Sequence, residues 1–266
     1  MEEYRKVVVV GIIIITLVAG AITLYYFLRT RTSLEKGPEG AKAEPALEEL
    51  SQKREVKSLD FLGISLAESD SLIRKLAREL SSHPKLEKWL QSDQLIRKFT
   101  AAVDNIANGL SPRPQIDFFA PRGEFRVEEK DGKLFLSPET YNRYDQVADI
   151  FLSLDTEACV RLYRQAKPLI QEAYRELGYP EKDFDDTLFQ AIVELLQVPV
   201  VEREIVLRKE LLTYVMVESE LEKLSEAQKH LLRMGPENVR IIQGKLKELA
   251  IALGFPEEKL PRTRIY

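Results

Sequence analysis

The feature that most constrains this chain is an unbroken run of uncharged, mainly apolar residues near its N-terminus, at residues 7–28. In helical conformation this run would cover about 33 Å, which matches a bilayer hydrocarbon core of about 30 Å. Tyr4, Tyr25 and Tyr26 stand at the two ends, where aromatic side chains favour the membrane interface. The run therefore predicts a single-pass transmembrane helix at residues 7–28, preceded by a short tail at residues 1–6.

A cleaved signal peptide is the alternative interpretation of this run, because Ala19-Gly20-Ala21 resembles a small-residue cleavage site. The apolar residues continue past that site to Leu28, which favours an uncleaved anchor. Two basic residues precede the run and four follow it closely: Arg5, Lys6, Arg29, Arg31, Lys36 and Lys42. That count favours a cytoplasmic domain by the positive-inside rule, whereas a short basic tail before an uncleaved anchor also fits an outward-facing domain.

Residues 29–58 are polar, lack aromatic side chains and contain several glycines and prolines. Because such a segment cannot bury enough apolar surface to order itself, we expect a flexible polar tether. Residues 59–266 remain for folding, and roughly 200 residues are enough to bury about 70% of the surface of the unfolded chain. We predict one compact, mostly helical domain in this range.

Apolar spacing in the domain predicts a succession of amphipathic helices, near residues 70–80, 86–90, 93–108, 137–151, 155–177, 183–196, 225–233 and 236–253. Side-chain caps are expected at Asp70, Asp93, Ser137, Asp155, Asp183 or Asp185, and Ser225. The dipeptide Asp131-Gly132 predicts the turn of a β-hairpin over residues 124–136. Residues 205–217 are rich in β-branched and aliphatic side chains and predict one or two further strands. The expected fold is mainly α, or α+β with a small β-hairpin, behind a single-pass transmembrane helix.

Five stretches of the domain together resemble a known family: Asp104–Gly109, Tyr141–Asp145, Leu162–Leu169, Ala173–Pro180 and Gln228–Asn238. This is an uncharacterised family of bacterial envelope proteins, catalogued only as a domain of unknown function. The resemblance covers roughly residues 59–254, and Leu-Leu-Arg-Met-Gly-Pro-Glu-Asn at 231–238 is its most specific part. Its members are N-terminally anchored, which implies a periplasmic domain on the bacterial inner membrane. The resemblance implies no activity, ligand or catalytic residue.

Side chains that could support catalysis are few, namely two histidines, His83 and His230, and one cysteine, Cys159. The sequence lacks the common metal-binding, nucleophile and phosphate-loop motifs, so we expect no catalytic residue, metal site or cofactor. We expect Cys159 to be a buried thiol and His230 to be a surface or packing residue. The net charge of −4, spread in mixed sign, argues against nucleic acid as a partner.

A group of acidic residues, Glu181, Asp183, Asp185 and Asp186, has two interpretations. Carboxylates at a helix start stabilise the positive end of the helix dipole. A pair of them could also serve as the acid and base of a glycan hydrolase. The position at an expected helix start favours the first interpretation.

We expect the domain to be a membrane-tethered interaction or scaffold domain of the bacterial envelope, which contacts the lipid bilayer through residues 7–28 and binds another envelope protein. Its contact surface is expected at the Pro- and Phe-rich loop of residues 111–123 with the adjoining hairpin, since long irregular loops often carry function. The predicted partner-binding residues are Phe118, Phe119, Arg122, Arg233 and Asn238. A carboxylate-dependent hydrolase of envelope glycans or peptides and a small-ligand sensor are the alternatives, and the sequence leaves the oligomeric state open.

Overall fold

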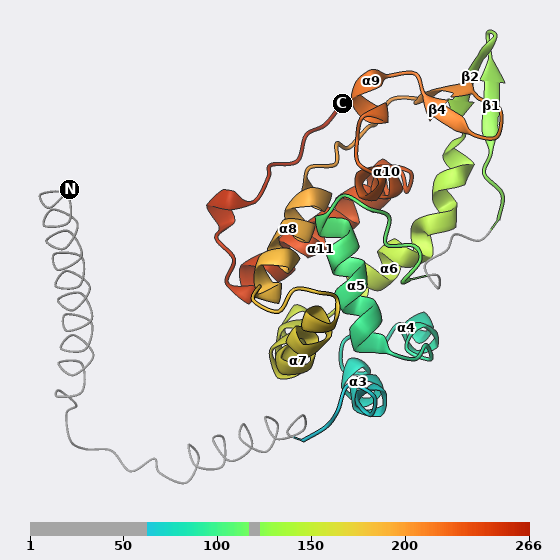
Figure 1. The fold of residues 1–266 in the computed structure, drawn as a ribbon. Helices are drawn as coiled ribbons and strands as arrows, with labels where there is room; N and C mark the ends of the chain where they lie inside the picture. Colours follow the sequence, from blue (N-terminus) through green and yellow to red (C-terminus); the bar gives the residue numbers. More distant parts are fainter. Residues whose placement is uncertain (1–62, 117–122) are drawn as a thin grey trace, which may run out of the picture. The chain divides into compact units, whose positions relative to one another are not determined.

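In the computed structural model, residues 63–116 and 123–266 are described, and Figure 1 shows their arrangement. All of them belong to one compact unit, which is mainly helical and carries one small antiparallel sheet. The transmembrane helix predicted at residues 7–28 and the tether at 29–58 lie outside the described residues. Within the described ranges, no helix is long and apolar enough to cross a membrane.

Nine α-helices are found in the described ranges: α3 (Ser69–Ala77), α4 (Pro84–Trp89), α5 (Leu95–Ala107), α6 (Asp145–Ser153), α7 (Thr156–Glu176), α8 (Phe184–Leu196), α9 (Ser219–Glu222), α10 (Glu226–Leu232) and α11 (Pro236–Leu253). Helix α5 packs against α7 and α8, and α11 packs against α6, α7 and α8. The predicted helices are therefore confirmed in kind and order. The short helix α9 was not predicted.

Side-chain caps confirm three of the six predicted helix starts. Asp155 accepts a hydrogen bond from the amide of Ala158 at 2.6 Å at the start of α7. Asp183, rather than Asp185, caps α8. Ser225 and Gln228 form a reciprocal capping box at the start of α10.

The cap of α5 differs from the prediction, which assigned it to Asp93. The two carboxylate oxygens of Asp70 accept hydrogen bonds from the amides of Gln94 and Leu95, at 2.7 and 2.9 Å. Asp93 instead forms an ion pair with Arg74 at 3.0 Å. Asp70, which was expected to cap its own helix, thus fastens α3 to the start of α5.

The sheet consists of four short strands: β1 (Val127–Lys130), β2 (Lys133–Leu136), β3 (Val206–Lys209) and β4 (Tyr214–Met216). They pair antiparallel in the order β1-β2-β3-β4. The predicted β1–β2 hairpin is confirmed, because Asp131 and Gly132 have φ of 51° and 70°, as its tight turn requires. Pairing of Leu134 with Leu207 joins this hairpin to the later strands, so the sheet is larger than predicted.

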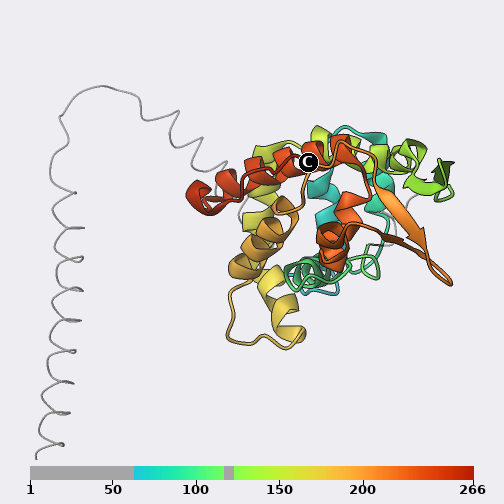
Figure 2. The ribbon, with the colours of Figure 1, turned by 90° about the horizontal axis from the view of Figure 1, so that it is seen from above.

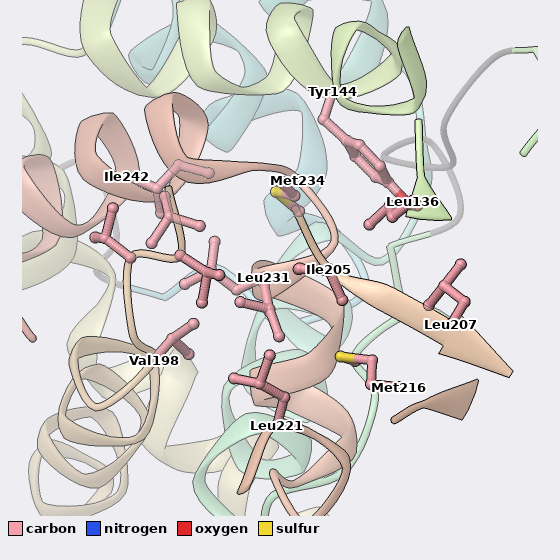
Figure 3. Packing of buried hydrophobic residues seen from close by; sticks show 14 residues of the cluster. Leu136, Tyr144, Val198, Ile205, Leu207, Met216, Leu221, Leu231, Met234 and Ile242 are labelled. Carbon is pink, nitrogen blue, oxygen red and sulfur yellow. The ribbon is translucent and has the colours of Figure 1, made fainter. Parts of the chain in front are cut away.

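A 3₁₀ helix, η2 (Pro138–Tyr144), connects β2 to α6. The predicted cap at Ser137 is not formed, because this hydroxyl donates to Glu128 Oε1 at 2.6 Å instead. The main core beside the sheet combines Leu207 and Met216 of the strands with Leu231 of α10 and Ile242 of α11 (Figure 3). This core fixes the end of α10 against the sheet.

Candidate functional site

A small apolar hollow opens between the sheet and the end of α10. It is lined by Phe125, Leu136, Ile205, Leu207, Tyr214, Met216, Leu232 and Arg233. Its empty volume is about 310 Å³, part of which is open to solvent. The rings of Phe125 and Tyr214 lie 5.7 Å apart between centroids, and Phe125 is 41% exposed. Arg233 supplies the one charged side chain of the lining, so the hollow suits an apolar group that has an acidic neighbour.

Three arginines are close enough to Tyr144, which is buried beside this hollow, for their charges to act on its phenol: Arg113, Arg143 and Arg233, called here the arginine cluster. Burial raises the pKa of Tyr144, and the positive charge of each of the three arginines opposes that rise. Burial also lowers the pKa of His230, and Arg233 and Arg113 lower it further. The three guanidinium groups therefore act on one small region of the molecule.

None of these arginines belongs to any ion pair among the described residues. Within the same part of the chain, Nε and Nη1 of Arg143 are buried and have no hydrogen-bond acceptor. The guanidinium of Arg143 lies 5.6 Å from the ring centroid of Tyr144. Buried donors without an acceptor are rare, because each costs about 1–3 kcal/mol. The cluster is thus a concentration of positive charge with unused donors.

The predicted site residues fall into three groups. Arg233 is exposed and belongs to both the hollow and the arginine cluster. Asn238 is buried, and its amide nitrogen lies within hydrogen-bond distance of Met234 O, Asp145 Oδ1 and Tyr141 O, at 2.9, 3.0 and 3.3 Å. Phe118, Phe119 and Arg122 lie outside the described residues.

The described ends of the predicted loop both approach the arginine cluster. Arg113, before the undescribed residues, is itself a member. At Gly123, after them, an added Cβ would lie 4.0 Å from Arg143 Cγ. The loop predicted from its prolines and phenylalanines therefore starts and ends at the same region as the helix corner at Arg233.

The two stretches 141–145 and 231–238, which carried part of the resemblance, meet in the fold. Asn238 bonds to the first stretch, and Gly235 packs against the ring of Tyr141. Each arginine lies two residues from this contact, Arg143 after Tyr141 and Arg233 before Gly235. The contact therefore holds the backbone segments that carry these two arginines against each other.

Two carboxylates of the acidic group at the start of α8 contact one cation, the amine of Lys167. Asp185 accepts hydrogen bonds from the phenol of Tyr163 and the amine of Lys167, and Asp183 lies 3.4 Å from the same amine. A backbone hydrogen bond from Asp185 is the main cause that lowers the pKa of Asp183, and Lys167 lowers it further. A glycosidase acid needs a raised pKa, so these carboxylates are arranged as structural charges.

The thiol of Cys159 lacks the lowered pKa that is typical of a reactive cysteine. Burial raises the pKa of Cys159 to about 11, so its thiol stays protonated near neutral pH. Within the described ranges, no group of three or more His, Cys, Asp or Glu side chains is arranged to hold a metal ion.

Sequence reasoning missed Arg113, Arg143 and Phe125 as site residues. Arg113 and Arg143 are separated by 30 positions and lie in different elements, so no spacing in the sequence links them. Arg143 lies in the stretch Tyr141–Asp145, which carries part of the family resemblance, and this is the one local signal that could have drawn attention to it.

A comparison with protein families finds a match at residues 95–250 to the family described as "Protein of unknown function (DUF3014)". The matched range begins with α5 and includes the whole sheet and the arginine cluster. The predicted resemblance to a domain of unknown function is therefore confirmed. No curated protein and no solved structure matches the chain.

Proposed function

This chain belongs to the DUF3014 family of proteins of unknown function, and from this premise we propose that it is an interaction domain tethered to a membrane of the bacterial envelope. Its arginine cluster binds an acidic segment of a partner protein. The observation that carries this function is Arg143, whose buried Nε and Nη1 have no acceptor among the described residues. A carboxylate of a partner that reaches these buried atoms would accept from one of them, since Nε–H and Nη1–H lie on different edges of the guanidinium.

The chemistry of the site favours carboxylates. Guanidinium groups present a planar fork of donors that matches a carboxylate in two parallel hydrogen bonds. The apolar hollow is lined in part by Arg233, and its rim offers apolar surface to a side chain of the same segment, although the enclosed space holds little more than one water molecule. Arginines and aromatic residues around a small apolar pocket are also the usual composition of an interface hot spot.

Support for the membrane tether comes from the sequence alone. The uncharged run at residues 7–28 has the length of a bilayer-spanning helix, and polar residues separate it from the domain. The envelope location and the periplasmic orientation follow from the resemblance of the domain to anchored envelope proteins. Phe118, Phe119 and Arg122 remain proposed contact residues, because the loop that contains them begins and ends at the arginine cluster.

The alternatives draw less support from the geometry. The carboxylates that a hydrolase would use are bound to Lys167 and Tyr163. The enclosed part of the hollow holds little more than one water molecule and the rest is open to solvent, whereas small-molecule sites enclose most of their ligand. Such an open apolar surface suits contact with a segment of a partner better than capture of a free molecule.

Site-specific photocrosslinking of the full-length protein in its native membrane tests this function. A photoreactive amino acid replaces Phe125 at the rim of the hollow, in chains that otherwise differ at one arginine. The Arg233→Ala variant should lose the crosslinked product, because it removes one positive charge of the cluster. The matched control is Arg161→Ala, which removes an exposed arginine of α7 that pairs only with Glu157 among the described residues. It should leave the product unchanged.

The sequence of the crosslinked segment shows whether the site binds an acidic partner. Mass spectrometry should find Asp or Glu within a few residues of the crosslink. A product that survives Arg233→Ala, or a crosslinked segment without acidic residues, contradicts the proposed function. Replacement of Phe118 and Phe119 by serine should likewise weaken the product while the domain stays folded.

A further inference from the structure

Two adjacent leucines are fully exposed to solvent at the turn between β3 and β4. Leu211 and Leu212 are each 100% exposed. Figure 2 shows the hairpin that carries them extending away from the helical body. Polar turn residues would close this hairpin equally well, and exposed leucines cost solubility. The pair therefore points to a contact made outside the domain.

The strand register places this tip beside basic residues. Because Leu134 pairs with Leu207, the end of β3 lies at the same end of the sheet as the β1–β2 turn. The two turns and the strand ends beside them carry four basic and two acidic side chains: Lys130, Lys133, Arg208, Lys209, Asp131 and Glu210. Glu210 accepts a hydrogen bond from Arg208 at 3.1 Å. Lys130 pairs with Glu128 and Glu204, at 3.1 and 2.6 Å. Lys133 and Lys209 belong to no ion pair among the described residues, so two lysines beside the exposed leucines are available to an anionic surface.

We propose that this hairpin tip docks on an anionic lipid surface, with Leu211 and Leu212 inserted at the boundary of headgroups and acyl chains. The lysine stems can extend along the same boundary while their amines contact lipid phosphates. The two leucines project from the tip and are not set in a pocket of the domain. Fluid lipid can surround such a projection without a preformed pocket. A protein partner would have to supply that pocket.

The length of chain before the domain allows this contact. Residues 29–62 separate the proposed anchor from the first described residue, Gly63. For a flexible tether of this length, chain statistics predict an average span of about 30 Å and a fully extended length of about 110 Å. The domain therefore stays near the bilayer, and a weak insertion suffices because binding is intramolecular. The inference rests on the proposed anchor, and it is independent of the acidic partner.

The test uses the full-length protein in vesicles, with a polarity-sensitive fluorophore on Thr213→Cys in a Cys159→Ala background. This position keeps both leucines and lies next to them. In vesicles rich in phosphatidylglycerol, emission should shift to the blue, and a quencher attached to lipid chains should reduce it. Phosphatidylcholine vesicles should give a smaller shift. Replacing both leucines by serine should abolish shift and quenching, and a fluorophore on Glu181→Cys, in the α7–α8 turn away from the sheet in Figure 1, should show neither.

Flotation of the same samples tests the membrane anchor separately from insertion of the hairpin tip. If the protein floats with the vesicles and the fluorophore at position 213 stays in a water-like environment, the anchor stands and the tip inference is overturned. If the protein does not float, the anchor is wrong, and the tip inference falls with it. A blue shift that grows with protein concentration in the absence of vesicles means that a second copy covers the leucines, which also overturns the inference. Circular dichroism of the serine variant confirms that its fold is intact.

Discussion

The backbone of Gly235 lies directly against the ring of Tyr141, so that a Cβ added to the glycine would come within 2.4 Å of Tyr141 Cγ. Gly235 also has φ of 89° and ψ of 162°, a conformation that residues with a side chain rarely adopt. The contact joins the corner between α10 and α11 to η2. Since Arg143 and Arg233 lie on either side of it, this corner is structural support for the arginine cluster.

Replacing Gly235 by alanine should therefore destabilise the domain strongly. Backbone strain and the clash with Tyr141 together predict a loss of about 3 kcal/mol or more in the free energy of unfolding. Urea unfolding followed by circular dichroism measures this loss. The matched control is Gly244→Ala, at an exposed position inside α11 where an added Cβ meets nothing within 4 Å. It should stabilise the domain by about 1 kcal/mol, because alanine favours the helix interior. Equal effects of the two substitutions would disprove the role of Gly235.

Asp70 caps α5 from a neighbouring helix, and its removal should cost more than the loss of an ordinary surface charge. Asp70→Ala leaves the amides of Gln94 and Leu95 without their acceptors, which predicts a loss of about 1–2 kcal/mol. Asp93→Ala removes an exposed partner of Arg74 and should change stability much less. Thermal unfolding of the two variants compares them directly. A larger loss of stability in Asp93→Ala than in Asp70→Ala would show that Asp93 caps α5, as the sequence predicted.

Local signals explain which parts of the fold could be predicted. The turn at Asp131-Gly132, the capping box at Ser225 and the proline at the start of α11 each act within a few residues, so their pattern is visible in the sequence. The hairpin and the helix order followed from them. Such signals state where an element begins and ends, and they do not state what it packs against.

The remaining features depend on contacts between distant residues. Asp70 lies 25 residues before Leu95, and the pairing of β2 with β3 joins positions about 70 residues apart. The arginine cluster is assembled from three separate segments, so only Arg233 could be identified, from the helix corner in which it lies. Asn238 was predicted from the same corner. In the fold its amide faces Asp145 and the core, whereas Arg233 faces solvent.

Arg233 and Asn238 should accordingly respond in opposite ways to substitution by alanine. Asn238→Ala leaves Asp145 and two backbone carbonyls without a buried donor, which predicts a loss of about 2 kcal/mol in unfolding free energy. Arg233→Ala removes an exposed side chain and should change stability by less than about 0.5 kcal/mol, while abolishing the crosslink at Phe125. Unfolding and crosslinking of both variants give the comparison. Loss of the crosslink in a stable Asn238→Ala protein would instead make Asn238 a direct contact of the partner.

Acidification should destabilise the domain through His230. Burial is the main cause that lowers the pKa of His230, and the positive charges of Arg233 and Arg113 add to it. Below a pH of about 6.5 the unfolded chain therefore takes up a proton that the folded chain excludes. The free energy of unfolding should fall as the pH decreases below this value, and it should level off below the pKa of the folded state. Urea unfolding at a series of pH values should show a weaker fall in His230→Gln, and an equal fall would exclude His230 as the cause.

Binding of an acidic partner should move the same pKa in the opposite direction. A carboxylate placed among Arg113, Arg143 and Arg233 offsets the positive charges that disfavour protonation of His230, so the pKa of His230 should rise in the complex. Proton NMR can follow the imidazole signals, because the chain has only two histidines. In His83→Gln the remaining imidazole signal belongs to His230. The crosslinked segment, made as a synthetic peptide, is the ligand for this titration. A peptide that binds without raising the pKa of His230 must bind away from the arginine cluster, because a negative charge within that cluster cannot leave the imidazole unaffected.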